Sequence, residues 1–303
     1  SSKLHGTIIT FESDPKIFPD RGLNWDTIVA HMRQQAYLVR GLRISMLDLR
    51  NVGKVADQDV FYLRELGIDA PSTTFYFEGG LRSLVAFQNH HLETIHKNIF
   101  YVEKEQDGVH VEVALQYVDD ITSRFSAFAN NIYNSEGGMH VTGFKTALTR
   151  TLNAQNKNGN GSAKGGSSSG GKESDSFTGD DALEGMTAVI SIKMREVQFE
   201  GQTKSKLGSV EARGATEAVF GEAFAQFLEE NPDDARAILG KVTLAMKARK
   251  AAKAAKDSIL RKGALDGMTL PGKLADCQSK SAEESELFIV EGDSAGGTAK
   301  MGR

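Results

Sequence analysis

Hydrophobic and polar residues alternate most regularly along residues 109–117. Valine, leucine, alanine or tyrosine fills most positions, and the polar residues His110, Glu112 and Gln116 all fall on even ones. Such alternation predicts a β-strand in a sheet that has one buried face. Two neighbours of this strand are expected at residues 99–102 and 124–129, and a further strand at residues 187–194.

A three- and four-residue spacing of apolar positions predicts helices elsewhere. In residues 25–39 this spacing follows Asn24, a favourable N-cap, and ends at Gly41. Residues 42–46 then alternate as a strand. Further helices are predicted at residues 143–155, 209–229 and 231–260.

The last of these helices is predicted to be long. It begins at Asn231-Pro232, an N-cap followed by a proline at the first helical position. We expect it to reach about Leu260 and to end at Gly263. Its apolar stripe comprises Ile238, Val242, Ala245, Ala252, Ala255 and Ile259.

The remaining segments are strand-like or irregular. Residues 7–11 and 287–290 are short apolar runs that predict strands. Residues 51–74 lack a clear period and predict a variable excursion. Residues 156–176 contain mostly Gly, Ser, Lys and Asn, so they predict a flexible loop inside a domain.

Composition narrows the class of protein. The 303 residues suffice for about two domains, and 40% of them are hydrophobic. A single cysteine, Cys277, excludes an internal disulfide framework and fits a reducing cytosol. There is neither an apolar run of about 20 residues nor a signal-peptide pattern at the start, so no membrane segment is expected.

The net charge of −4 does not predict nucleic-acid binding, but the charges are segregated. Between residues 241 and 262 the only acid is Asp257, and this stretch either contacts an anionic backbone or forms a solvated helix face. Its basic residues are Lys241, Lys247, Arg249, Lys250, Lys253, Lys256, Arg261 and Lys262.

Two segments carry candidate chemistry. Glu291 ends an apolar run before a Gly/Ser-rich turn, where a carboxylate either binds a hard cation such as Mg²⁺ or is simply solvated. Asp293 and Ser294 are expected to be N-caps of a following helix. In residues 201–208, Gln202 offers an amide and Lys204 a charge for a phosphate oxygen, although exposed loops of this composition are common.

Other residues give weaker signals. His90, His91 and His96 lack metal-ligand spacing, and the pairs Gly79-Gly80 and Gly137-Gly138 predict turns. The sequence contains no Walker-type phosphate loop, no G-x-G-x-x-G after a strand and no local Ser–His–Asp pattern.

Seven segments form a recognisable series along most of the chain. They are FYFEGGLRSLVAF (75–87), HKNIFYVEKEQDGVHVEVALQY (96–117), EGGMHVTGFKTALTRTLN (136–153), GDDALEGMTAVISIK (179–193), GQTKSKLG (201–208), RKGALDGMTLPGKLADCQ (261–278) and ELFIVEGDSAGG (286–297). Taken in order, they resemble the B subunits of bacterial DNA gyrase, a type IIA topoisomerase. The LADCQ and FEGQTK contexts favour gyrase over the related topoisomerase IV subunit.

The resemblance implies an α+β fold: a transducer domain with a mixed sheet and a left-handed βαβ crossover, long exit helices, and the first strand of a Rossmann-like TOPRIM domain. The nucleotide motifs of the family and its paired D-x-D acids are absent, so an internal piece of a longer subunit is expected. The implied parts are a terminal strand of the GHKL-type ATP-binding domain (1–20), the transducer domain (21–230), a connecting helix (231–270) and the start of TOPRIM (271–303).

The resemblance also implies roles. Gln202 and Lys204 match the loop that contacts the γ-phosphate of ATP, and Glu291 matches the first TOPRIM acid, which is catalytic and binds Mg²⁺ together with acids outside this chain. The implied activity is ATP-dependent DNA supercoiling in the cytoplasm. The implied partners are double-stranded DNA, the gyrase A subunit with its catalytic tyrosine, and a second copy of the gyrase B chain in an A₂B₂ tetramer, with no membrane. The piece alone is expected to be inactive.

Other functions remain open. A topoisomerase IV subunit, which decatenates DNA, shares several of the motifs. A second alternative is a nucleic-acid-binding module that uses the helix 241–262 and has no coupling role. A third is another nucleotide-switched machine with a transducer fold, but relatives of that kind lack the TOPRIM-like EGDSAGG found here at residues 291–297.

Overall fold

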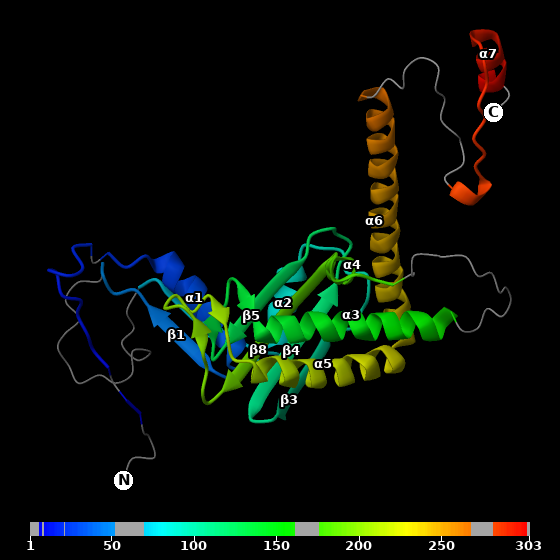
Figure 1. Cartoon of the computed structure of the whole chain (residues 1–303). Coiled ribbons are helices and arrows are strands. Elements are labelled where there is room, and N and C mark those ends of the chain that lie inside the picture. Colours follow the sequence, from blue (N-terminus) through cyan, green and yellow to red (C-terminus); the bar gives the residue numbers. More distant parts are fainter. Residues whose placement is uncertain are drawn as a thin grey trace. The chain divides into compact units, whose positions relative to one another are not determined.

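The computed structural model describes residues 6–7, 9–20, 22–51, 70–160, 176–267 and 281–301. The chain divides into two compact units, residues 1–243 and residues 244–303. Figure 1 labels the elements of both units.

A five-stranded mixed sheet, in the order β3-β4-β8-β5-β6, forms the centre of the first unit (Figure 1). β8 pairs antiparallel with β4 and parallel with β5. The expectation that residues 124–129 lie beside residues 109–117 is therefore wrong, because β8 inserts between them. The strands are β3 (Phe100–Gln106), β4 (Val109–Tyr117), β5 (Arg124–Ala129), β6 (Ile132–Tyr133) and β8 (Met186–Met194).

Two helices, α3 (Met139–Asn160) and α5 (Glu211–Glu230), pack along one face of this sheet. Strand register places the odd residues of β4 on this face, because Leu115 lies opposite Phe100. The Phe100 ring meets the Phe220 and Phe224 rings edge-on, with centroids 5.4 and 5.3 Å apart. Aromatic and aliphatic burial thus holds the helices to the sheet.

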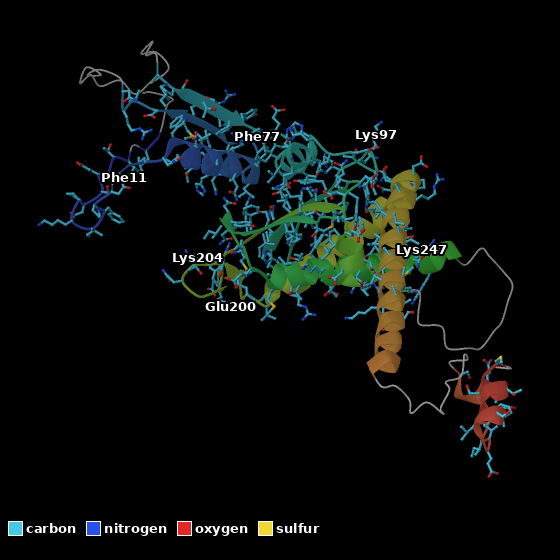
Figure 2. All side chains as sticks on the ribbon, turned by 90° about the horizontal axis from the view of Figure 1, so that it is seen from above. Phe11, Phe77, Lys97, Glu200, Lys204 and Lys247 are labelled. Atoms are coloured by element: carbon cyan, nitrogen blue, oxygen red, sulfur yellow. The ribbon has the colours of Figure 1, made fainter. Side chains whose placement is uncertain are left out.

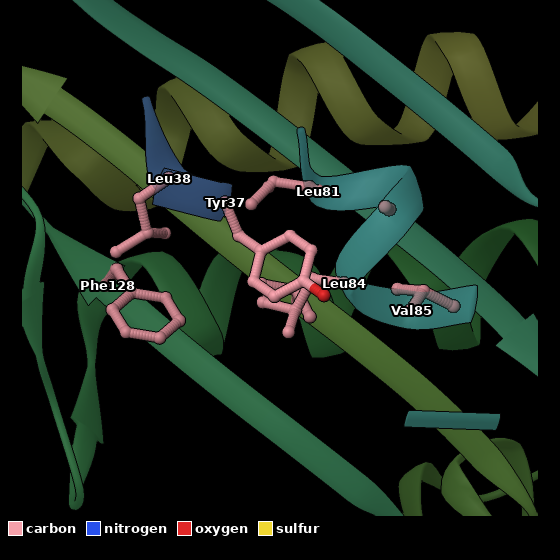
Figure 3. Close-up of a cluster of buried hydrophobic side chains, with 8 residues drawn as sticks. Tyr37, Leu38, Leu81, Leu84, Val85 and Phe128 are labelled. Carbon is pink, nitrogen blue, oxygen red and sulfur yellow. The ribbon is translucent and has the colours of Figure 1, made fainter. Parts of the chain in front are cut away.

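The opposite face is also covered, by α2 (Leu81–Asn89) and the end of α1 (Trp25–Leu38). Figure 3 shows Tyr37 and Leu38 of α1, Leu81 and Leu84 of α2 and Phe128 of β5 in one buried cluster. Since both faces are covered, the prediction of one buried face is wrong. Two of the three polar even-numbered residues of β4 are buried: Glu112 and Gln116 are each 5% exposed.

The α1 prediction is confirmed, including its cap: Asn24 Oδ1 accepts a hydrogen bond from Thr27 N at 2.9 Å. α3 is longer than expected and runs through residues 156–160, which the composition assigned to a loop. Adding residues to an existing helix gains one hydrogen bond for each residue fixed, so polar composition alone does not end it. Residues 161–175 of the expected loop lie outside the described residues.

A separate two-stranded antiparallel sheet joins β1 (Arg43–Leu47) to β2 (Ser72–Tyr76). Residues 72–74 of the expected excursion are therefore strand, and residues 52–69 lie outside the described part. The strand expected over residues 7–11 is not formed in the described residues 6–7 and 9–20. Ile9 and Phe11 there are 82% and 87% exposed, because an apolar run forms a strand only when it has a partner.

Helix α6 (Pro232–Gly267) begins at Pro232 as predicted but continues through Gly263 to Gly267. Its expected apolar stripe is buried only at its start. Ile238 and Val242 are fully buried, whereas Ala252 and Ala255 are exposed. The short α4 (Gly179–Leu183) precedes β8.

The second unit contains the short 3₁₀ helix Ala282–Glu284 and α7 (Asp293–Met301). Residues 287–290 are not a strand, and Leu287 and Ile289 are 88% and 89% exposed. The expected N-caps Asp293 and Ser294 lie inside α7, because Gly292, at φ 88°, occupies the position before it. Among the described helices, none has the length and apolar character needed to cross a bilayer.

Candidate functional site

The loop that carries Gln202 and Lys204 is held by a small sheet of three two-residue strands. β9 (Phe199–Glu200) and β10 (Lys206–Leu207) flank the loop and pair antiparallel, and β10 also pairs parallel with β7 (Gly137–Gly138). Gly137-Gly138, predicted to be only a turn, is therefore the strand that ties this loop to the start of α3.

Gly138 is required for this pairing. Its φ is 136°, and a Cβ built on it would lie 2.5 Å from the backbone nitrogen of Leu207. Real Cβ atoms essentially never approach a neighbour within 3.0 Å, so only glycine lets the two backbones meet. α3 begins at the next residue, so the loop and α3 share one rigid junction.

Gln202 and Lys204 lie together at the exposed end of the loop, and Figure 2 shows Lys204 and Glu200 there. Gly201 and Lys204 both have left-handed backbones, at φ 81° and 56°. Lys206 pairs with Glu200 at 2.9 Å, whereas Lys204 Nζ lies 5.8 Å from the centroid of the Phe199 ring. Lys204 is thus the lysine of this loop with no acidic partner among the described residues, and it is free to meet an anion.

Residues far away in the sequence hold the loop. Asn134 Nδ2 donates to the Lys204 carbonyl oxygen at 2.8 Å. Glu136 N donates to the Ser205 carbonyl oxygen at 2.9 Å, and Ser205 Oγ donates to Glu136 Oε1 at 2.7 Å. The sequence does not single out Asn134, and Glu136 enters it only as the first residue of the segment 136–153. Both residues lie about 70 residues before the loop, so nothing local connects them to Lys204.

Glu291 is exposed and lies in the second unit, before α7. No group of three or more His, Cys, Asp or Glu side chains with metal-binding geometry occurs among the described residues. The structure therefore brings Gln202 and Lys204 together but assembles no set of described carboxylates around Glu291.

The basic stretch 241–262 is only partly available to an anionic partner. The Lys241 side chain is 9% exposed and its Nζ lies 3.3 Å from Asp119 Oδ1, so this lysine is a structural contact. Arg249, Lys250 and Lys253 have intramolecular partners as well. Lys247, labelled in Figure 2, and Lys256 are exposed. The side chains of residues 259–262 lie outside the described set.

His96 lies in a buried polar network and not at an open site. Its Nε2 accepts a hydrogen bond from Tyr117 N at 2.9 Å, and its Nδ1 lies 3.9 Å from Asp234 Oδ2. Burial lowers the pKa of His96 below its ordinary value, although the Asp234 carboxylate opposes that shift. This network links β4 to the first turn of α6.

Solved structures share this fold. The 43K ATPase domain of Thermus thermophilus gyrase B, in complex with an aminocoumarin, matches with a TM-score of 0.64 and 30% identity, over 82% of this chain and 60% of that one. The ATP-binding domain of topoisomerase IV from Francisella tularensis, in complex with a small-molecule inhibitor, matches with a TM-score of 0.60 over 78% of this chain and 57% of that one. At 21% identity, the second likeness shows the fold alone. The fold is thus one that bacterial topoisomerase subunits share.

Sequence comparison is more specific. A family model described as DNA gyrase B matches residues 80–258. The DNA gyrase B protein of Clostridium acetobutylicum is 44% identical over all of this chain, and that of Bacillus mycoides is 45% identical over 98% of it. The chain belongs to the DNA gyrase B family. It spans 44% of the length of the Clostridium protein and 68% of the Bacillus one.

Proposed function

We propose that this chain is the part of a DNA gyrase B protein that couples the state of bound ATP to passage of one DNA duplex through another. The observation that carries the proposal is the exposed, acid-free Lys204 on a loop tied directly to α3. In this proposal Gln202 and Lys204 contact the γ-phosphate of ATP held by the GHKL-type domain of the same protein. The activity is negative supercoiling by the complete type II topoisomerase.

The chemistry of the loop suits a phosphate sensor. A lysine ammonium is a compact charge that follows a phosphate oxygen, and the Gln202 amide adds a neutral donor. ATP supplies the transferable γ-phosphoryl group, and the charge of this group is lost from the site after hydrolysis and phosphate release. Lys204 therefore has a strong partner only while ATP is bound. This difference can shift the equilibrium between two arrangements of the protein.

The connections of the loop give this bias a physical route. Lys206 and Leu207 pair with Gly137 and Gly138, and α3 starts at Met139. α3 packs along α5 so closely that a Cβ on Gly143 would overlap the Arg213 backbone. A displacement of the loop is thus passed to two packed helices without a flexible joint.

For Mg²⁺ the described residues do not form a site, because no group of three or more His, Cys, Asp or Glu side chains that could hold a metal ion occurs among them. In this proposal Glu291 is the first TOPRIM acid and acts with carboxylates outside this chain. The Glu291→Gln variant of the complete enzyme is expected to lose DNA cleavage while it keeps ATP binding. Retained cleavage removes this assignment.

The domain plan remains part of the proposal: an end of the GHKL-type domain, without the strand first expected over residues 7–11, then a transducer with a left-handed crossover between β5 and β8, a connecting helix and a TOPRIM start. The separate β1–β2 sheet and the start of the family match at residue 80 favour a transducer boundary between β2 and α2, and not at residue 21. The proposed partners are duplex DNA, gyrase A and a second gyrase B chain, in the cytoplasm.

Two alternatives have different tests. The shared fold supports a topoisomerase IV subunit as the first alternative. If the complete enzyme relaxes supercoiled DNA but does not introduce negative supercoils, this alternative is the correct one. A DNA-binding role for α6 is weakened because Lys241 is buried. Salt-dependent DNA binding that is lost on replacing Lys247 and Lys256 supports that role.

The deciding experiment is Lys204→Ala in the full-length gyrase B protein assembled with gyrase A. We expect ATP turnover and supercoiling to fall at least tenfold while the unfolding temperature stays unchanged, because Lys204 is exposed. Lys97→Ala is the matched control, since Lys97 is an exposed lysine outside the loop. Wild-type ATP turnover in Lys204→Ala overturns the proposal.

A further inference from the structure

We propose that Asn134 is a positioning residue for Lys204: its side-chain amide fixes the backbone of the lysine and thereby aims the ammonium group. The inference rests on the proposed role of Lys204 and adds a residue that neither the motif nor the family comparison assigns. It is carried by the hydrogen bond of 2.8 Å from Asn134 Nδ2 to the Lys204 carbonyl oxygen.

The backbone of Lys204 needs such support. Its φ of 56° lies in the left-handed region, where the Cβ of an ordinary residue is crowded by the backbone. Its own amide makes only a 3.4 Å contact with the Gly201 carbonyl oxygen across the turn. The Asn134 hydrogen bond fixes the peptide plane after Lys204 and so holds the residue in this conformation.

Asn134 can act in this way because it is itself fixed. Its side chain is nearly inaccessible, and the residue is 2% exposed. Its backbone nitrogen donates to the Ala127 carbonyl oxygen in β5 at 2.8 Å, and its carbonyl oxygen accepts from Gly137 N at 3.0 Å. The central sheet, the small sheet and the lysine are therefore joined through one residue.

Two further hydrogen bonds keep the loop from rotating about the bond between Asn134 and the Lys204 carbonyl oxygen. Glu136 N donates to the Ser205 carbonyl oxygen, and the Ser205 hydroxyl donates to the Glu136 carboxylate. Consecutive carbonyl oxygens, of Lys204 and Ser205, are thus both held from the segment 134–136. Two adjacent fixed peptides leave the lysine side chain, and not its backbone, as the moving part.

Without the amide donor, Lys204 can relax toward the ordinary helical region and its ammonium group leaves the direction set by the loop. Asn134→Asp tests this closely, because Asp has nearly the same shape but presents an oxygen to the Lys204 carbonyl oxygen. Asn134→Ser shortens the side chain by one bond, so its hydroxyl does not reach the Lys204 carbonyl oxygen, and it adds no charge. It therefore serves if the aspartate variant does not fold.

Asn130→Asp is the matched control. Asn130 lies in the same hairpin and also clamps a backbone, with Nδ2 donating to Met194 O and Oδ1 accepting from Met194 N, each at 2.9 Å. It does not touch the loop of Lys204. Any effect of weakening this hairpin in general appears in both variants.

The experiment measures kcat and KM for ATP hydrolysis by the full-length gyrase B protein assembled with gyrase A, together with the unfolding temperature. We expect Asn134→Asp and Asn134→Ser to lower kcat/KM for ATP about tenfold, the change that loss of one buried hydrogen bond produces. Asn130→Asp, at an equal or larger loss of unfolding temperature, is expected to keep kcat/KM within about twofold.

A double-mutant cycle separates positioning from mere stability. If Asn134 acts through Lys204, adding Asn134→Ser to Lys204→Ala lowers kcat/KM no further. Additive losses, or an unchanged kcat/KM in both Asn134 variants while Lys204→Ala is inactive, overturn this inference and leave the proposed function standing. Full activity of Lys204→Ala itself overturns the proposed function.

Discussion

Asn98 Nδ2 lies 2.8 Å from Asp234 Oδ2, and this partly buried hydrogen bond joins the segment before β3 to the first turn of α6. Asn98 N donates to the same oxygen at 3.3 Å. Asp234 is 6% exposed and lies at a helix N-terminus, where the helix dipole favours a negative charge. The start of α6 is therefore fixed to the sheet by one carboxylate.

Replacing that carboxylate is expected to loosen the start of α6. Asp234→Ala removes a carboxylate that accepts two hydrogen bonds from Asn98, at a cost of about 1.5–3 kcal/mol in the free energy of unfolding. Urea denaturation of the chain measures it. Asp233→Ala is the control, because the side chain of Asp233 is 89% exposed and its ion pair with Arg236 lies at the surface. Equal losses in the two variants contradict the prediction.

The burial of His140 is expected to make the free energy of unfolding fall at acidic pH. The residue is fully buried, and burial lowers its pKa to about 4. Because the unfolded chain takes up the proton at about pH 6.5, stability falls as the pH drops from 6.5 to 4, by about 3 kcal/mol. His140→Leu is expected to flatten this part of the pH profile in thermal unfolding. The same flattening in His91→Leu, at an exposed position, contradicts the assignment.

Gly138→Ala is expected to disrupt the junction between the loop of Lys204 and α3. The new Cβ overlaps the Leu207 backbone, and φ is 136°, so a loss of about 3 kcal/mol or more is expected in urea unfolding. Gly214→Ala is the opposite case: it lies within α5 with nothing near its Cβ, so a gain of about 0.5–1 kcal/mol is expected. Similar effects in the two variants contradict the close approach.

Asn153 clamps the backbone of Phe177. Its Nδ2 donates to Phe177 O at 3.0 Å, and its Oδ1 accepts from Phe177 N at 2.8 Å. Deleting residues 165–171, which lie between the clamped residues and leave eight residues to return from the end of α3, is therefore expected to change the free energy of unfolding by less than about 1 kcal/mol. Asn153→Ala is expected to cost about 1–3 kcal/mol in the same urea titration. If the deletion lowers the free energy of unfolding more than Asn153→Ala does, Asn153 is not what holds the two ends of this segment together.

The sequence predicts elements whose signal is local. The alternation in residues 109–117 and the Asn24 cap are both reproduced by β4 and α1. The chemistry and the motif of the Gln202 and Lys204 loop are likewise visible in consecutive residues. In each case the residues that create the signal are neighbours along the chain.

What depends on contacts between distant residues could not be predicted in this way. Residues 287–290 have strand composition but no strand conformation, since pairing needs a partner. Glu112 and Gln116 are polar by type, yet α1 and α2 cover them. Asn134 lies about 70 residues before the lysine it supports, so only the folded chain reveals the contact.

β8 occupies the middle of its sheet, although the ribosome makes it after the other four strands. The β3–β4 and β5–β6 hairpins are synthesised first, and the edges of β4 and β5 that pair with β8 stay open until residue 194 has left the exit tunnel. The nascent chain therefore carries these two edges unpaired while about 60 further residues are translated, and this interval is when it is most exposed to mispairing and most in need of a chaperone.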